Sequence, residues 1–196
     1  MRKNREKITT FRRELTLIKD YEMRRFVETL LDEADDAFFK KPASASGKFH
    51  NVIQNGVGGL VIHTKDVVYF TKRLIETEMF DVKGYEDHLI SAAIIHDICK
   101  YTNTDGEHTN LEHPKLAAEY IREMYDKYLD SRREAFYNNT NTTDILKAGD
   151  LEIIISAVET HMGKWGEKEP TTDVDKVLHI ADFLASRNGV YILRKY

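Results

Sequence analysis

The 196-residue chain contains a single cysteine, Cys99, so no disulfide can form within it. It has no apolar run long enough to cross a bilayer or to act as a signal sequence, and we therefore expect a cytoplasmic protein that does not interact with membranes. It also has no excess of positive charge. The net charge of −4 argues against tight nonspecific binding to nucleic acid, so a small nucleotide or a short single strand suits the chain better than a long duplex.

The alternation of β-branched and polar residues that is typical of strands is nearly absent, and most of the chain follows the helical period. We therefore predict an all-α fold, a helical bundle that forms one globular domain. Residues 1–41 are expected to form N-terminal scaffold helices, residues 42–187 the core, and residues 188–196 a C-terminal tail. The polar stretch of residues 130–149 predicts a surface loop.

Two predicted helices lead to the first three candidate ligands of a metal ion. One places His63 at the inner end of an apolar stripe, after a glycine-rich turn at residues 56–59. The apolar run of residues 89–95 predicts a central helix that ends at His96 and Asp97. Burying two adjacent ionisable groups is costly unless a partner such as a metal ion is present. Because neighbouring residues of a helix point about 100° apart, this pair suits two ions with the carboxylate between them.

Three further candidates follow at the ends of later helices. His113 precedes a proline, which favours the first position of a helix, and His161 closes an apolar helix that Asp150 would cap. Asp182 lies beside the apolar stripe of a last helix that a threonine at residues 171–172 would cap. Imidazole and carboxylate are preferred ligands of divalent transition ions, so we predict two ions, with Mn, Fe or Ni favoured over Zn or Mg. The predicted metal ligands are His63, His96, Asp97, His113, His161 and Asp182.

Each of these residues has a structural alternative when it is considered alone. A histidine such as His63 or His161 at the end of an apolar stripe is more often a hydrogen-bonded core residue than a ligand. His113 would act as an N-cap, and Asp182 would pair with an arginine such as Arg187. The fixed order of all six residues weighs against these alternatives. Three other histidines, His88, His108 and His179, are expected to be structural.

Five segments of the chain carry a resemblance to a known family: PASASGKFHNVIQNGVGGLVIHTKDVV, AAIIHDICK, EHPKLAAEYI, ETHMGKWG and HIADFLASR. Between roughly Pro42 and Arg187 the chain resembles the HD-domain superfamily of metal-dependent phosphohydrolases, whose binuclear members share the pattern H…HD…H…H…D. The resemblance implies that residues 42–187 are an HD-domain core. It also implies that His63, His96 and Asp182 hold one ion, that His113 and His161 hold the other, and that Asp97 bridges them.

The activity that this resemblance implies is hydrolysis of a phosphomonoester or phosphodiester by a hydroxide held between two metal ions. Asp97 and Lys100 would be the catalytic residues, with Lys100 also binding phosphate. The segment from Pro42 to His63 looks most like HD proteins that act on nucleotides or RNA ends, including a group of bacterial 3′-5′ exoribonucleases. A nucleotide-like substrate is therefore expected, and Trp165 is a candidate to stack on its base. The predicted substrate-binding residues are Lys48, His50, Lys100, Lys164 and Arg187.

Two other functions remain open at the level of sequence. A branch of the same superfamily that includes inositol oxygenase uses the same ligand order for a diiron centre that activates dioxygen, and ligand types do not separate it from a hydrolase. Lys100, beside the His-Asp pair, favours phosphate over dioxygen. The second alternative is a non-catalytic, nucleotide-binding regulatory module, against which the full set of six ligands argues. The sequence does not indicate an oligomeric state.

Overall fold

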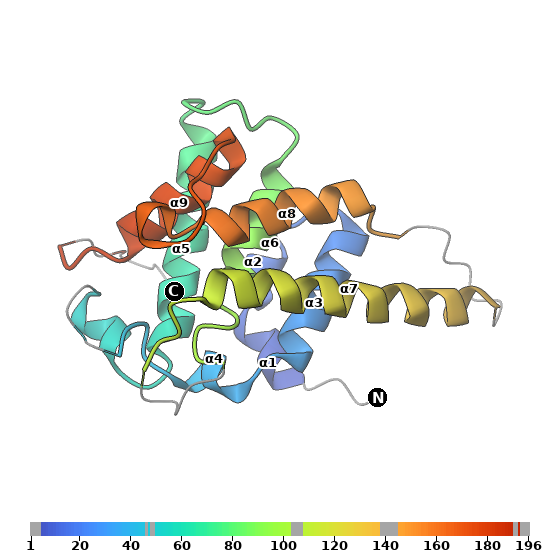
Figure 1. The fold of residues 1–196 in the computed structure, drawn as a ribbon, viewed down its shortest axis with the longest axis horizontal. Helices are drawn as coiled ribbons and strands as arrows, with labels where there is room; N and C mark the ends of the chain where they lie inside the picture. The colour runs from blue at the N-terminus through green and yellow to red at the C-terminus, as the bar shows by residue number, and fades with distance from the viewer. Residues whose placement is uncertain are drawn as a thin grey trace.

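The protein is described by a computed structural model that covers residues 5–45, 47, 50–102, 108–137, 145–189 and 192. These residues form helices and loops and no strand, so the predicted all-α fold is confirmed (Figure 1). None of the described helices combines the length and the apolar character that crossing a membrane requires. The helices in chain order are α1 (Arg5–Thr10), α2 (Arg12–Leu15), α3 (Tyr21–Glu33), α4 (Asp36–Lys40), the 3-10 helix η1 (Val52–Asn55), α5 (Gly59–Glu76), α6 (Glu86–Ile95), α7 (His113–Tyr137), α8 (Ala148–Thr160), the 3-10 helix η2 (Gly163–Trp165) and α9 (Asp173–Ala185).

Helix α6 is the centre of the bundle. Every residue from 88 to 95 is buried, and α6 packs against α3, α5, α8 and α9. Figure 1 shows α6 in the middle of the molecule, with α5 on one side and α3 on the other. The apolar run therefore forms the predicted central helix, because a helix that is apolar all round can be stable only when other helices cover every face.

The N-terminal helices pack on one side of this centre. Phe11, Phe26 and Phe38 are buried there, and α3 contacts both α6 and α7. A buried ion pair joins α3 to α7, with Glu22 Oε1 2.6 Å from the guanidinium of Arg132. These contacts support one side of the central helix.

Two of the sequence-based boundaries are wrong. Helix α7 continues to Tyr137, so residues 130–137 are helical rather than part of a loop, while residues 138–144 lie outside the described part of the chain. The N-cap of α8 is Lys147, and Asp150 lies within the first turn, where it pairs with His88 at 3.0 Å. A carboxylate in the first turn still interacts favourably with the helix dipole, which explains why the sequence suggested a helix start there.

The cap of the last helix is predicted correctly. Thr172 is the N-cap of α9, and its side chain accepts a hydrogen bond from the backbone N–H of Asp175. The Asp175 carboxylate in turn accepts from the backbone N–H of Thr172, which completes a capping box. This box fixes the start of α9, and the helix then carries Asp182 in its last turn.

Candidate metal centre

The ends of five helices meet at the candidate metal centre. His63 lies within α5, and His96 and Asp97 follow the last residue of α6. His113 is the first residue of α7, and His161 follows the last residue of α8. Asp182 belongs to α9, which packs along α5 and α8. The fold therefore brings together six side chains that span 120 positions of the sequence, from residue 63 to residue 182.

The Asp97 carboxylate occupies the middle of this cluster and is only 1% exposed. Its Oδ2 atom is 3.5 Å from His63 Nε2 and 3.3 Å from His96 Nε2. Its Oδ1 atom is 2.9 Å from His113 Nε2 and 3.6 Å from His161 Nε2. Each oxygen of one carboxylate therefore faces a different pair of imidazoles.

Asp182 completes the group around His63. Its Oδ1 atom is 3.0 Å from His63 Nε2 and 3.8 Å from His96 Nε2, and its side chain is 20% exposed. The ligand atoms of His63, His96 and Asp182 lie within 4.8 Å of one another, as do those of His96, Asp97 and His161. On the other side of Asp97, the Nε2 atoms of His113 and His161 are 3.2 Å apart. The arrangement thus has two neighbouring places for a cation.

Backbone carbonyls fix the orientation of three of the four rings. In each case Nδ1 donates a hydrogen bond to the backbone carbonyl three residues earlier. The pairs are His96 with Ala93 (2.9 Å), His113 with Asn110 (2.6 Å) and His161 with Val158 (2.7 Å). A neutral imidazole that is protonated at Nδ1 presents a lone pair at Nε2, which is the atom directed at the cluster.

These hydrogen bonds explain why the cluster fits divalent ions. The lone pairs at Nε2 face carboxylate oxygens and one another at 2.9 to 3.8 Å, an arrangement of acceptors that is repulsive unless a cation lies between them. The Nε2 atoms of His63 and His96 and the Oδ1 atom of Asp97 are buried and make no hydrogen bond within the described residues. Leaving such buried atoms unpaired is costly, and coordination to a metal ion satisfies all of them.

The ionisation of the cluster agrees with this fit. Burial by itself would raise the pKa of Asp97, but Lys100, whose Nζ lies 2.6 Å from Oδ2, and the surrounding imidazoles hold it well below its usual value. For Asp182, contact with His63 outweighs burial and likewise lowers the pKa. Burial lowers the pKa of His63 and of His113. At pH 7 the two carboxylates are therefore charged and these two imidazoles neutral, which are the forms that bind metals.

His96 differs from the other rings in this respect. Burial lowers its pKa, but the charge of the adjacent Asp97 more than compensates, so the pKa of His96 lies above its usual value. Because a metal ion binds the neutral form of imidazole, protonation of His96 and binding of an ion compete with each other.

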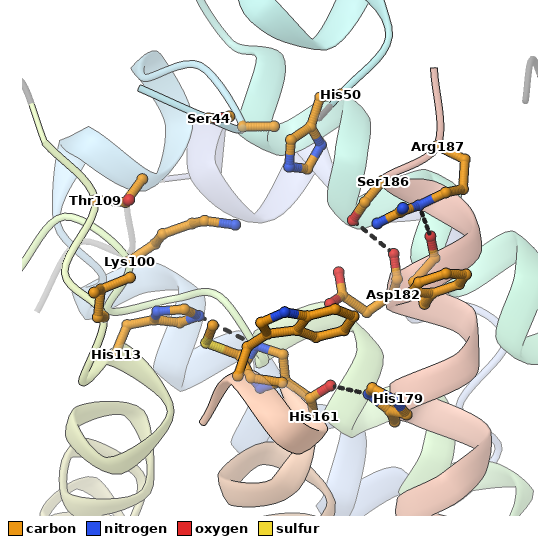
Figure 2. Close-up of a pocket in the computed structure, with 15 residues that line it drawn as sticks. Ser44, His50, Lys100, Thr109, His113, His161, His179, Asp182, Ser186 and Arg187 are labelled. Carbon is orange, nitrogen blue, oxygen red and sulfur yellow. Dashed lines mark hydrogen bonds between the residues drawn. The ribbon is translucent and has the colours of Figure 1, made fainter. Parts of the chain in front are cut away.

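A cavity of about 510 Å³ opens directly above the cluster (Figure 2). His113, His161 and Asp182 form its floor, and Lys100 reaches into it from the turn that follows α6. The cavity falls within the range of small-molecule sites. Its other lining residues are Ala43, Ser44, His50, Thr109, Leu111, Met162, Trp165, His179, Phe183, Ser186 and Arg187.

Only some of the predicted substrate-binding residues line the cavity. His50, Lys100 and Arg187 line the cavity. Lys164 is not among the lining residues; its Nζ lies 4.9 Å from the centre of the Trp165 ring. Lys48 lies outside the residues that the structure describes. Lys164 therefore contacts the wall of the cavity rather than its interior.

An aromatic wall of Trp165 and Phe183 forms one side of the cavity, and of these two residues only Trp165 was singled out from the sequence. Trp165 and Phe183 stack nearly parallel, with an angle of 11° and ring centres 6.2 Å apart, and the Arg187 guanidinium lies 4.0 Å from the Phe183 ring centre. Trp165 is 55% exposed and Phe183 37%. The only sign in the sequence that Phe183 lies at the cavity was its position directly after Asp182. An apolar residue at such a position is normally expected to be part of the core.

His179 lines the cavity and supports the metal centre from behind. Its Nδ1 donates a hydrogen bond to the backbone carbonyl of His161 at 2.7 Å, which holds the chain just after α8 (Figure 2). This contact agrees with the structural role expected from the sequence. His88 has a structural role as well, because it pairs with Asp150 away from the cavity.

A family model described as "HD domain" matches residues 60–187, which is more than half of the chain. The matched segment begins three residues before His63 and ends five residues after Asp182, so it contains all six side chains of the cluster. No curated protein and no solved structure gives a significant match.

Proposed function

The chain belongs to the HD-domain family, and on that premise we propose that it is a metal-dependent phosphohydrolase that cleaves a phosphomonoester or phosphodiester of a nucleotide or short oligonucleotide. The observation that supports this proposal most directly is the position of Asp97, whose two oxygens face two separate pairs of imidazoles. One carboxylate between two sets of ligands is what two adjacent ions require. The presence of Lys100 beside it favours an anionic substrate.

Two divalent ions would be held as follows. His63, His96 and Asp182 would bind one ion, His113 and His161 the other, and Asp97 both. Such ions, when bound, lower the pKa of water and neutralise phosphoryl oxygens. The imidazole-rich ligand set favours manganese, iron or nickel.

Lys100 would bind the phosphoryl group. Its Nζ lies 2.6 Å from Asp97 Oδ2 and its side chain lines the cavity, so it places a positive charge beside the cluster. An ammonium group on a flexible stem can move from the carboxylate to a phosphoryl oxygen without a change in the backbone. On the opposite side, the guanidinium of Arg187 offers a second cation at the rim. The cavity therefore has one positive charge beside the cluster, at Lys100, and a second next to the aromatic wall, at Arg187.

The aromatic wall is suited to the base of a nucleotide. Trp165 exposes more than half of its surface, and Phe183 supports it from one side. A base that stacks on an aromatic side chain gains about 1–3 kcal/mol. A nucleotide could therefore contact the wall with its base while its phosphate reaches Lys100.

Replacing Trp165 with alanine is expected to raise the KM for a nucleoside monophosphate by about tenfold, because the stacking contribution is lost. The KM for ribose phosphate, which has no base, should not change, and Trp165→Phe should retain most of the affinity. Trp165 is the only tryptophan of the chain, so quenching of its fluorescence by the nucleotide reports binding directly. An equal loss for ribose phosphate would show that Trp165 supports the cavity but does not recognise the base.

The test of the proposed function is product release from a panel of phosphoesters. Nucleoside mono- and triphosphates, cyclic dinucleotides and short oligonucleotides are incubated with manganese, nickel or anaerobic iron(II), and phosphate and nucleoside are measured. We expect metal-dependent turnover of one class of these esters. Iron(II)-dependent uptake of oxygen without hydrolysis would instead indicate the oxygen-activating branch, and nucleotide binding without turnover would indicate a regulatory module.

A further inference from the structure

Three buried polar side chains form a hydrogen-bonded relay that ends at the cavity. The Nδ1 atom of His50 is 2.8 Å from Gln54 Oε1, and Gln54 Nε2 donates to Asp66 Oδ2 at 2.7 Å. All three residues are buried, Gln54 completely. The His50 ring packs edge-on against His63, with ring centres 4.8 Å apart and an angle of 82°. The relay therefore connects helix α5 with the cavity wall beside the metal centre.

The chemistry of the relay fixes the direction of each hydrogen bond. A carboxylate can only accept, so Asp66 orients the Gln54 amide with its NH₂ group toward Asp66 and its oxygen toward His50. The amide oxygen in turn can only accept, so Nδ1 of His50 carries a hydrogen. In the neutral ring the other nitrogen, Nε2, then has a lone pair and acts as an acceptor.

The backbone around Gln54 holds this relay in place. The Gln54 carbonyl accepts a hydrogen bond from the N–H of Ala43 at 2.9 Å, and its own N–H donates to the Asn51 carbonyl at 3.0 Å. Gly59, the first residue of α5, packs directly on the Gln54 carbonyl. A buried polar network is favourable only when its members are satisfied and rigid, and these contacts provide that rigidity.

His50 points into the cavity from the wall opposite His161 (Figure 2). Lys100 and Asp182 line the same part of the cavity, so a group bound at the cluster lies within reach of the ring. His50, His63, His96, His113 and His161 all direct a nitrogen inward. Among the described residues a side-chain relay orients His50, whereas a backbone carbonyl orients His96, His113 and His161. His50 therefore differs from the candidate ligands in how it is held.

We propose that His50 binds substrate by accepting, through Nε2, a hydrogen bond from a hydroxyl group that lies next to the scissile phosphate, and that Gln54 and Asp66 are positioning residues that keep Nδ1 protonated. In a nucleotide that hydroxyl belongs to the sugar. The assignment of the donor rests on the proposed function, because it assumes a phosphoester at the metal centre. The assignment of the tautomer does not, since it follows from the relay alone.

The first test is the tautomer of His50 in the metal-free protein. Nitrogen-15 NMR of the imidazole groups, with the His50 signals identified by their loss in His50→Phe, shows directly which ring nitrogen carries hydrogen. We expect hydrogen on Nδ1 in the wild-type protein and a mixture of tautomers in Gln54→Met, which keeps the size of the side chain but removes the acceptor. Hydrogen on Nε2 in the wild-type protein would overturn the proposal without any need for a variant.

The second test compares a ribonucleotide substrate with its deoxy analogue. For wild-type enzyme, loss of the hydroxyl should lower kcat/KM by about tenfold, as expected for one hydrogen bond, and His50→Phe should erase this difference. An equal preference for the hydroxyl in wild type and in His50→Phe would refute the assignment of the donor. If no phosphoester is turned over but the tautomer is as expected, the proposed function fails while the relay stands.

Discussion

Replacing Asp97 with asparagine is expected to reduce metal-dependent turnover by about 10³-fold or more, because ions at such a site contribute several kcal/mol to transition-state stabilisation. Asparagine has nearly the same volume as aspartate but lacks the negative charge. It also offers only one oxygen, whereas Asp97 directs one oxygen to His63 and His96 and the other to His113 and His161. The variant should therefore lack the carboxylate that joins the two cation positions, while the surrounding helices keep their packing.

Metal binding gives a measurement that does not depend on knowing the substrate. A ligand that binds only the folded state raises the melting temperature, so manganese or nickel should stabilise the wild-type protein clearly and Asp97→Asn much less at the same concentration. Asp150→Asn is a matched control, since Asp150 also pairs with a histidine, His88, but does not belong to the metal cluster. Turnover in Asp97→Asn within tenfold of the wild type would contradict the bridging role of this carboxylate.

Replacing Gly59 with alanine is expected to lower the free energy of unfolding by about 2–3 kcal/mol, although alanine is the better helix former. A Cβ atom at this position would lie 1.9 Å from the carbonyl oxygen of Gln54 and 2.5 Å from its carbonyl carbon. Both are backbone atoms, so no side-chain rotation can relieve the clash. The start of α5 or the 3-10 helix η1 must shift instead.

The shift should displace residues of the metal centre as well as lower the free energy of unfolding. His63 follows Gly59 by about one helical turn, and Gln54 holds His50, so both sides of the cavity depend on this close approach. Thermal unfolding should show a melting temperature lower by about 5–10 °C. Gly149→Ala is the control: it lies in the first turn of α8 with no described atom within 4 Å of an added Cβ, and it should stabilise the protein by up to about 1 kcal/mol. Equal stability of the two variants would show that the contact with Gln54 relaxes at no cost.

The helices could be predicted well where the period of apolar residues was long and uninterrupted. The central helix and the Thr172 cap of α9 follow from local patterns, because burial on all sides and a capping box each require particular residues at fixed spacing. The end of α7 could not be predicted in this way. Residues 130–134 of α7 are polar, and a polar stretch is typical of a loop even when it continues a helix that is stabilised elsewhere.

The sequence by itself determined the types of side chain available for a metal site and their places at the ends of helices, because ligand chemistry and helical period are both local properties. Only the tertiary structure decided that the two oxygens of Asp97 face different imidazole pairs, that Trp165 stacks on Phe183, and that a relay through Gln54 orients His50. Each of these depends on the rotamers and the approach of segments far apart in the chain. Such contacts are set by how whole helices pack, and residue spacing along one helix carries no information about them.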